Sequence, residues 1–213
     1  MTTMTTQFRH PIFARLVAFV AARAEGSEDD DRRRELLSGL HGRVVELGAG
    51  SGPNFRLYPA TVDEIVAVEP EDYLRGKAEE AAERSGRSIS LVDALADELP
   101  FADASFDAAV AALVLCSVPS QASALAELRR VVRPGGELRF YEHVVARAPR
   151  YARFQRAVGR VTPHLAGGCH PDRDTGAAIE QAGFRVERVR RFVVPSVVEL
   201  PVAPRILGAA RRP

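Results

Sequence analysis

The sequence of 213 residues contains two cysteines, no tryptophan and a single lysine, Lys77. Two cysteines, Cys116 and Cys169, cannot form the disulfide framework of a small secreted protein, and no secretion signal is recognisable. We therefore expect a reducing, cytoplasmic environment. Cysteines this few and this far apart also exclude a metal site built from cysteines alone.

The sequence also lacks an excess of charge of either sign, with 29 basic residues, 28 acidic residues and a formal net charge of +1. No overall field therefore favours nucleic acid or an anionic membrane as the main partner. No apolar run reaches the ~20 residues that a membrane-spanning helix needs. The length fits one domain with a substantial core. We expect no nucleic-acid partner and no transmembrane segment, and we make no prediction of the oligomeric state.

Short apolar runs alternate with helical patterns from residue 44 onward. Apolar runs predict strands at 44–47, 65–68, 89–92 and 106–115, and alternating patterns predict strands at 137–142 and 184–194. Helical patterns lie at 72–84, 121–132 and 173–182. Strands that are apolar on both faces and separated by helices indicate an α/β fold with a parallel, doubly wound sheet. A stretch with several prolines and glycines, 147–171, precedes the last of these helices.

The first 41 residues are expected to form a helical cap on the domain at 42–213. Residues 12–20 carry apolar side chains at helical spacing, a stripe that most often packs against a core. Docking on the sheet edge and weak peripheral contact with a membrane surface are the open alternatives. The charged run at 28–35 is interpreted as a solvated helix face.

A glycine-rich turn follows the first predicted strand. Gly48, Gly50 and Gly52 have G-x-G-x-G spacing, which lets the backbone pass close to a ligand and presents free amides. Pro53 breaks the G-x-G-x-x-G register of dinucleotide folds. The Gly-Lys-Ser/Thr of a phosphate loop is absent. The turn therefore differs from both of these nucleotide-binding loops.

Two carboxylates stand at the ends of the first two predicted strands. Glu46 would repel a pyrophosphate but suits the ammonium group of an amino-acid cofactor. Glu69, kept extended by Pro70, can accept hydrogen bonds from both hydroxyls of a ribose. This pattern favours S-adenosylmethionine (SAM) over NAD, and a NAD-dependent oxidoreductase is the weaker alternative.

Five segments resemble, in order and spacing, the motifs of class I SAM-dependent methyltransferases. They are Glu-Leu-Gly-Ala-Gly-Ser-Gly at 46–52, Val-Glu-Pro at 68–70, Leu-Pro-Phe at 99–101, Ser-Phe-Asp at 105–107 and Arg-Pro-Gly-Gly at 133–136. The resemblance implies a Rossmann-like sheet of seven strands, mostly parallel with an antiparallel last strand, and helices on both faces. It assigns the methionine end of SAM to Glu46, Gly48, Gly50 and Gly52, and the ribose to Glu69.

The resemblance leaves two candidates for the contact with adenine. The family places an Asp-Ala pair before the segment that leads to Leu-Pro, and counting back from Leu99 reaches Ala96 instead of Asp93. Asp93 binds the adenine amino group if the loop bulges by a residue or two. Otherwise the backbone of Ala96 serves, with Asp97 alongside. Leu113 is also assigned to the cofactor.

Later segments resemble a narrower group, the methyltransferase-like 7 proteins. They are Leu-Val-Leu-Cys-Ser-Val at 113–118, Phe-Tyr-Glu-His-Val at 140–144, Gly-Gly-Cys-His at 167–170 and Leu-Pro-Val-Ala-Pro at 200–204. Animal members methylate alkyl thiols and carry an N-terminal membrane anchor. This chain is most similar to their bacterial, anchorless homologues. The resemblance implies methylation of a small lipophilic acceptor, first of all a thiol, with S-adenosylhomocysteine as the product.

Residues at the carboxyl ends of the fourth and fifth strands border the ligand crevice in such sheets. We predict an acceptor pocket that includes Phe13, Cys116, Ser117, Glu142 and His170. Residues 143–171 form its lid. His143 is the candidate catalytic base, because its unperturbed pKa lies near neutrality. A role in orienting Glu142 is the equal alternative.

We predict no metal site. Cys169 and His170, with His164 upstream, lack any standard zinc spacing, so a turn of the lid is the preferred interpretation. Cys116 is interpreted as a small apolar pocket wall. Two other functions stay open. One is methylation of oxygen or nitrogen in a quinone-like or lipid acceptor, and the other is a SAM-binding module without catalysis.

Overall fold

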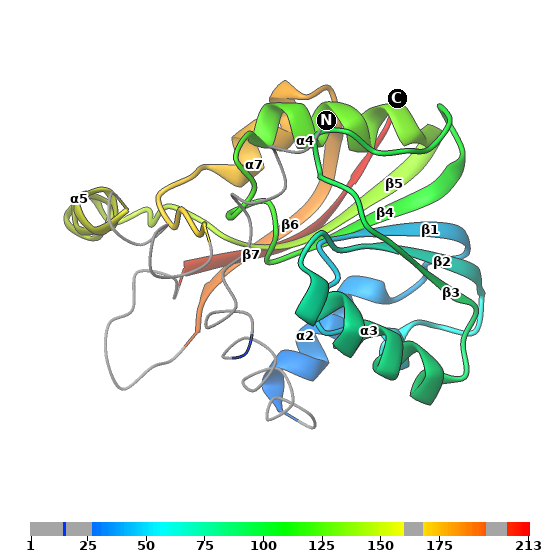
Figure 1. The fold of residues 1–213 in the computed structure, drawn as a ribbon. Coiled ribbons are helices and arrows are strands. Elements are labelled where there is room, and N and C mark those ends of the chain that lie inside the picture. The colour runs from blue at the N-terminus through cyan, green and yellow to red at the C-terminus, as the bar shows by residue number, and fades with distance from the viewer. Residues whose placement is uncertain (1–14, 16–26, 160–167, 195–203) are drawn as a thin grey trace, which may run out of the picture.

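The computed structural model describes residue 15 and residues 27–159, 168–194 and 204–213. A central sheet has helices packed on both faces (Figure 1). The strands are β1 (Gly42–Leu47), β2 (Val62–Val68), β3 (Ile89–Val92), β4 (Phe106–Ala112), β5 (Val132–His143), β6 (Arg185–Val193) and β7 (Pro204–Arg211). The helices are α2 (Glu28–Leu37), η2 (Phe55–Leu57), α3 (Asp72–Ser85), α4 (Gln121–Val131), α5 (Pro149–Val158) and α7 (Thr175–Gln181).

The seven strands lie in the order β3-β2-β1-β4-β5-β7-β6. β1 pairs in parallel with β2 and β4, and β4 pairs in parallel with β5. β7 is antiparallel to both of its neighbours, β5 and β6. The predicted sheet, mostly parallel with an antiparallel last strand, is therefore confirmed. The strand order reverses between β1 and β4, and ligands bind at the carboxyl ends of strands at such a switch point.

Buried side chains fill both faces of the sheet. On one face, Val45 and Leu47 of β1 belong to a cluster with Leu125 of α4. On the other face, Val44 belongs to a cluster with Leu37 of α2. Because successive strand residues point to opposite faces, an apolar run buries both sides. This is why the apolar runs of the sequence predict the strands.

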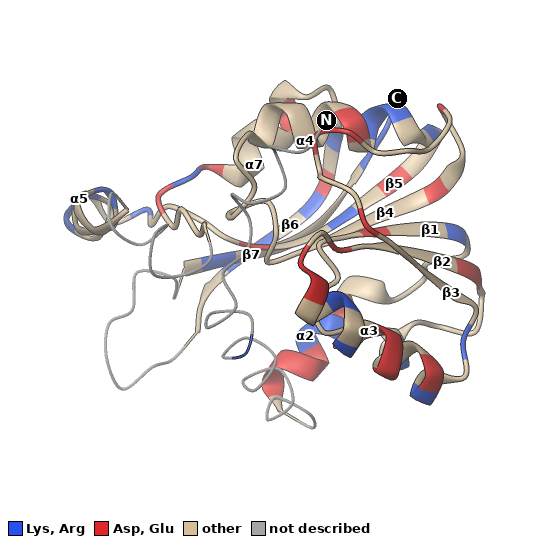
Figure 2. Cartoon of the chain, in the orientation of Figure 1, with Lys and Arg blue, Asp and Glu red and all other residues tan. Residues whose placement is uncertain are grey.

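Helix α2 has the predicted solvated face, at Glu28, Asp31, Arg34 and Glu35, but its charged run also supplies a buried side. Arg33 is buried, and it donates hydrogen bonds to Asp29 and Asn54. Tyr141 of β5 donates to Asp29 at 2.7 Å. Because its charges are paired within the helix and with the sheet, one side of the helix can be buried. α2 and α3 carry both acidic and basic residues, whereas the charged residues of α5 are arginines (Figure 2).

The structure differs from the predicted elements at three places. α5 forms within residues 147–171, where no helix was predicted, and its Pro149 stands in the first turn, where a missing amide hydrogen costs little. β4 ends at Ala112 and not at residue 115. β5 begins at Val132 and not at residue 137, directly after α4 ends.

The N-terminal cap is described only in part. The apolar stripe at 12–20 lies outside the described residues apart from Arg15, so its docking stays a prediction. Leu36 and Leu37, within the predicted cap, pack into the core cluster of the domain. Within the described residues, no helix has the length and hydropathy needed to span a membrane.

Candidate active site

The glycine-rich turn lies between β1 and η2, at the switch point of the sheet. Gly48, Gly50 and Gly52 have left-handed φ angles of 61°, 59° and 77°. A Cβ on Gly48 would lie 2.3 Å from Val114 Cγ2, so the turn packs against the segment after β4. A Cβ on Gly50 would meet nothing within 4 Å. Gly50 therefore borders open space in which a ligand can approach the backbone.

Glu69, directly after β2, reaches the glycine-rich turn. Its Oε2 accepts a hydrogen bond from the Gly50 amide at 2.8 Å, and its Oε1 accepts one from the Glu71 amide at 3.0 Å. Burial raises the pKa of Glu69, while both amides act in the opposite direction. A carboxylate offers about four lone-pair sites. The two amides therefore leave acceptor capacity, which suits the predicted contact with ribose hydroxyls.

Glu46 lies inside the protein and is only 1% exposed. Its two oxygens accept hydrogen bonds from Asn54 Nδ2 and Tyr58 Oη, each at 2.7 Å. Burial outweighs these bonds and raises the pKa of Glu46 to about 7. The side chain therefore ties β1 to the residues that follow the turn. Its contact with the methionine end of SAM stays a prediction.

A pocket of about 390 Å³ opens at the end of β3. It is lined by Asp93, Ala94, Leu95, Glu98, Leu99 and Pro100. Asp93 is exposed, and its carboxylate lies 3.5 Å from the Arg75 guanidinium. Ala96 is not part of this lining and packs against the core instead. The contact with adenine stays a prediction for both candidates, of which Asp93 lines this pocket.

The segment after β4 is held in place by Glu142 of β5. Leu113, its first residue, has a φ of 60°, which is uncommon for a residue other than glycine and typical of functional sites. The fully buried Glu142 accepts hydrogen bonds from the amides of Val114, Leu115 and Cys116 at 3.0, 2.9 and 3.1 Å. A buried carboxylate needs such donors. Glu142 is therefore directed at the backbone of this segment, and its predicted place in the acceptor pocket is not supported by its described contacts.

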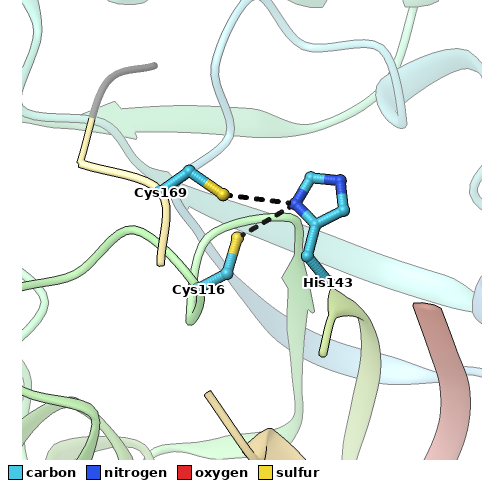
Figure 3. Close-up of side chains that lie close together, drawn as sticks. All are labelled: Cys116, His143 and Cys169. Atoms are coloured by element: carbon cyan, nitrogen blue, oxygen red, sulfur yellow. Dashed lines mark hydrogen bonds between the residues drawn. The ribbon is translucent and has the colours of Figure 1, made fainter. Parts of the chain in front are cut away.

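The side chain of Cys116, in this segment, lies close to the side chains of His143 and Cys169 (Figure 3). His143 Nδ1 lies 3.4 Å from Cys116 Sγ and 3.6 Å from Cys169 Sγ. Both cysteines are buried and free of disulfide bonds. A hydrogen bond between the two thiols raises the pKa of Cys116 and lowers the pKa of Cys169. Cys169 is therefore the first of the pair to lose its proton.

The second ring nitrogen of His143, Nε2, is buried and has no hydrogen-bond partner among the described residues. An unpaired buried polar atom costs about 1–3 kcal/mol, so this nitrogen marks a place where a bound molecule is expected. Within the residues that the structure describes, no hydrogen bond joins the side chains of His143 and Glu142. The His143 ring faces the two sulfurs (Figure 3). The contacts of the ring among the described residues are therefore with the two sulfurs, and both predicted roles of His143 stay predictions.

Ser117 and His170 lie beside these three residues, as predicted for the acceptor side. Ser117 Oγ is 3.6 Å from Cys116 Sγ, and the His170 amide donates a hydrogen bond to the Cys116 carbonyl at 2.8 Å. The loop before α7 is thereby docked on the segment after β4. Phe13 and residues 160–167 of the predicted lid lie outside the described residues.

This arrangement agrees with sequence matches to known proteins. A family described as methyltransferase domain matches residues 45–140. Thiol S-methyltransferase TMT1B of Rattus norvegicus is 34% identical over 93% of this chain and 85% of its own length. The Homo sapiens TMT1B is 35% identical over 85% of this chain and 78% of its own length. The chain belongs to the class I SAM-dependent methyltransferases.

The fold of this methyltransferase agrees with solved structures. A SAM-dependent methyltransferase from Mesorhizobium loti has a TM-score of 0.65 and 24% identity, over 88% of this chain and 99% of that chain. Because the chain belongs to this family, SAM is its cofactor. The residues present fit it, since the open face of Gly50, the spare lone pairs of Glu69 and the pocket at Asp93 follow the carboxyl edge of the sheet from β1 to β3.

Sequence reasoning missed three residues of this methyltransferase's site. Asn54 and Tyr58 follow Glu46 by eight and twelve residues in no motif, so the partners of this buried carboxyl group had no signal. Cys169 did have a signal in the sequence, because it lies in a segment that resembles the methyltransferase-like 7 group, as Cys116 and His143 do.

Proposed function

We propose that this methyltransferase transfers a methyl group from SAM to the sulfur of a small, lipophilic thiol. The observation that carries the proposal is how far the likeness to thiol S-methyltransferases extends. The family match ends at residue 140, whereas the identity with the Rattus norvegicus protein covers 93% of the chain. It therefore extends into the second half of the chain, which supplies His143, Cys169 and His170 to the acceptor side.

In this proposal the glycine-rich turn, with Glu46 beneath it and Leu113 beside it, holds the methionine end of the cofactor. Glu69 holds the ribose and Asp93 the adenine. SAM supplies an electrophilic methyl group on a sulfonium sulfur and leaves as S-adenosylhomocysteine. Because the transfer is an in-line displacement, the protein's main task is to align the acceptor with that methyl group.

The acceptor side is formed by Cys116, Ser117, His143 and His170. A thiol reacts as its thiolate, so the site must favour the deprotonated sulfur more than it must supply a strong base. His143 is placed to do this, because it lies at the end of β5 with one nitrogen toward two sulfurs and the other unpaired among the described residues. His143 therefore activates the acceptor thiol.

The proposal is tested by supplying SAM with three acceptors of similar size: an alkyl thiol, a phenol and an alkyl amine. We expect the S-methylated thiol and S-adenosylhomocysteine in equal amounts, measured by mass spectrometry. Product from the phenol or the amine alone would replace the thiol by the oxygen or nitrogen alternative. Saturable SAM binding without product from any acceptor would make the protein a binding module.

The role of His143 is tested by His143→Gln. We expect the rate on the thiol to fall about 100-fold, a typical size for the loss of one activating side chain, with SAM affinity unchanged. The control is His41→Gln, since His41 is exposed between α2 and β1, away from the glycine-rich turn. A normal rate for His143→Gln at every pH would leave His143 a structural residue.

A further inference from the structure

Three metal-ligating side chains converge at the acceptor side. Sγ of Cys116, Nδ1 of His143 and Sγ of Cys169 all lie within 4.8 Å of one another. They come from the segment after β4, the last residue of β5 and the loop before α7 (Figure 3). Convergence of two sulfurs and a nitrogen from three separate segments is typical of a metal site.

The spacing of these atoms fits one tetrahedral ion. With Zn–N of about 2.0 Å and Zn–S of about 2.3 Å, a ring nitrogen and a sulfur on the same tetrahedral zinc lie about 3.5 Å apart. The distances from His143 Nδ1 are 3.4 Å to Cys116 Sγ and 3.6 Å to Cys169 Sγ. Both distances therefore match a nitrogen and a sulfur that share one ion, and all three atoms lie within 4.8 Å of one another.

The backbone around these ligands is held by hydrogen bonds that do not depend on an ion. Glu142 accepts from the Cys116 amide at 3.1 Å, and the His170 amide donates to the Cys116 carbonyl at 2.8 Å. Gly168, with a left-handed φ of 83°, lies so close to Ser117 that a Cβ would be 2.7 Å from the Ser117 carbonyl oxygen. The two cysteines are thereby brought together before any ion binds.

We propose that Cys116, His143 and Cys169 bind a zinc ion whose fourth position takes the sulfur of the acceptor thiol. Thiolate and imidazole ligands select zinc over magnesium or calcium. Two thiolates neutralise the charge of the ion, which suits a buried site. Three protein ligands with one open position are typical of catalytic zinc, whereas structural zinc has four.

The inference rests on the proposed function and explains how His143 activates the thiol. On binding the ion, the acceptor thiol loses its proton to solvent, because a coordinated thiol is deprotonated. The thiolate sulfur then forms a bond to the methyl carbon as the bond from that carbon to the sulfonium sulfur breaks. The electron pair of the broken bond stays on the cofactor sulfur, so charge balances. His143 acts here as a ligand and not as a proton acceptor.

The first test is metal content. Protein purified without chelator is expected to contain about one zinc per chain by elemental analysis. After zinc is removed, titration with Co²⁺ should produce visible bands of a tetrahedral site and a thiolate-to-cobalt charge-transfer band, saturating at one equivalent. Negligible zinc together with no cobalt bands overturns the inference, as does a disulfide between the two cysteines in place of the ion.

The ligands are tested by Cys116→Ser, Cys169→Ser and His143→Gln. Each is expected to weaken Co²⁺ binding at least 100-fold, with the charge-transfer band reduced in the cysteine variants. His170→Gln is the matched control, because His170 adjoins Cys169 but its side chain is not one of the three ligands, and it should keep the full spectrum. Retained SAM affinity shows that each variant is folded. Normal Co²⁺ spectra in folded ligand variants would overturn the inference.

The two proposals fail in different ways. Thiol methylation at an unchanged rate in zinc-free protein would refute the zinc ion and leave the thiol as the acceptor. Zinc bound at one equivalent, without methylation of any thiol, would refute the proposed acceptor and leave the zinc site.

Discussion

Gly50 and Gly86 have nearly the same backbone conformation, with φ angles of 59° and 64°, and a Cβ on either would meet nothing within 4 Å. Gly50 lies in the cofactor turn, whereas Gly86 ends α3 at the opposite edge of the sheet. Alanine at either position incurs the same left-handed strain, roughly 1–2 kcal/mol. We expect both variants to lose this much stability in urea unfolding, and only Gly50→Ala to bind SAM at least tenfold more weakly.

Calorimetric titration with S-adenosylhomocysteine distinguishes the two glycine variants. Gly86→Ala is the control for strain, since it changes the backbone equally without touching the site. Equal affinity in both variants would show that the open face of Gly50 is not used by the cofactor.

Glu46 predicts a dependence of stability on pH. Burial raises its pKa from 4.5 to about 7 in the folded state. The stability that its protonated form contributes is therefore fully present below about pH 4.5 and is lost as the pH rises through about 7. One pKa unit corresponds to about 1.4 kcal/mol, so the loss is roughly 3 kcal/mol. Glu46→Gln, which cannot ionise, should not show this loss.

The measurement is the free energy of unfolding in urea at about pH 5 and about pH 8 for both proteins. Other buried carboxyl groups, such as Glu69 and Glu142, contribute equally to both. Only the difference between the two pH dependences therefore reports Glu46. Identical dependences would contradict the raised pKa.

At the scale of elements, the segment after β4 depends on Glu142. Its removal leaves three buried amides without their acceptor, each at a cost of about 1–3 kcal/mol. We expect Glu142→Ala to lower the free energy of unfolding by at least 3 kcal/mol, as measured by urea unfolding. Glu64→Ala is the control, because Glu64 is half-exposed and paired with Arg43, and it should lose less than about 1 kcal/mol. If Glu142→Ala loses as little free energy of unfolding as Glu64→Ala, the segment after β4 does not depend on Glu142.

Some strands can be predicted from the sequence and others cannot. β1 to β5 carry enough aliphatic residues to be predicted from the pattern of their apolar side chains. β7 does not, because Pro-Arg-Ile-Leu-Gly-Ala-Ala-Arg is rich in residues that do not favour strands. Its Gly208 is needed by the sheet, since a Cβ there would lie 2.5 Å from the Phe140 ring. Packing between β5 and β6 therefore decides β7, and only the family resemblance predicted a seventh strand.

At the scale of the whole molecule, cofactor binding should stabilise the fold. A ligand at 100 times its Kd adds about 2.7 kcal/mol. For a domain of this size that corresponds to a rise in Tm of roughly 5–10 °C. We expect S-adenosylhomocysteine to give this rise in a thermal-shift experiment, NAD to give none, and Glu69→Ala to reduce it. A rise with NAD and none with S-adenosylhomocysteine would contradict the cofactor.

The sequence by itself determined the sheet, the glycine-rich turn and the methyl donor. Each is encoded by neighbouring residues, as in the turn at 48–52, or by patterns that repeat along a strand. Adenine binding was less determined, because Asp93 and Ala96 are both close to the predicted position. The structure adds that Asp93 lines a pocket and Ala96 does not, which depends on how the loop after β3 packs.

Only the tertiary structure brings together the residues of the proposed acceptor side. Cys116 and His143 are 27 residues apart, and His143 and Cys169 are 26 apart. No local spacing connects them, which is why no metal site was predicted. They meet because parallel strands bring their carboxyl ends to one edge of the sheet, and because the His170 amide docks the loop before α7 on Cys116. The methyl donor could therefore be predicted from the order of residues, whereas the grouping of Cys116, His143 and Cys169 depends on how the strands are arranged in the sheet.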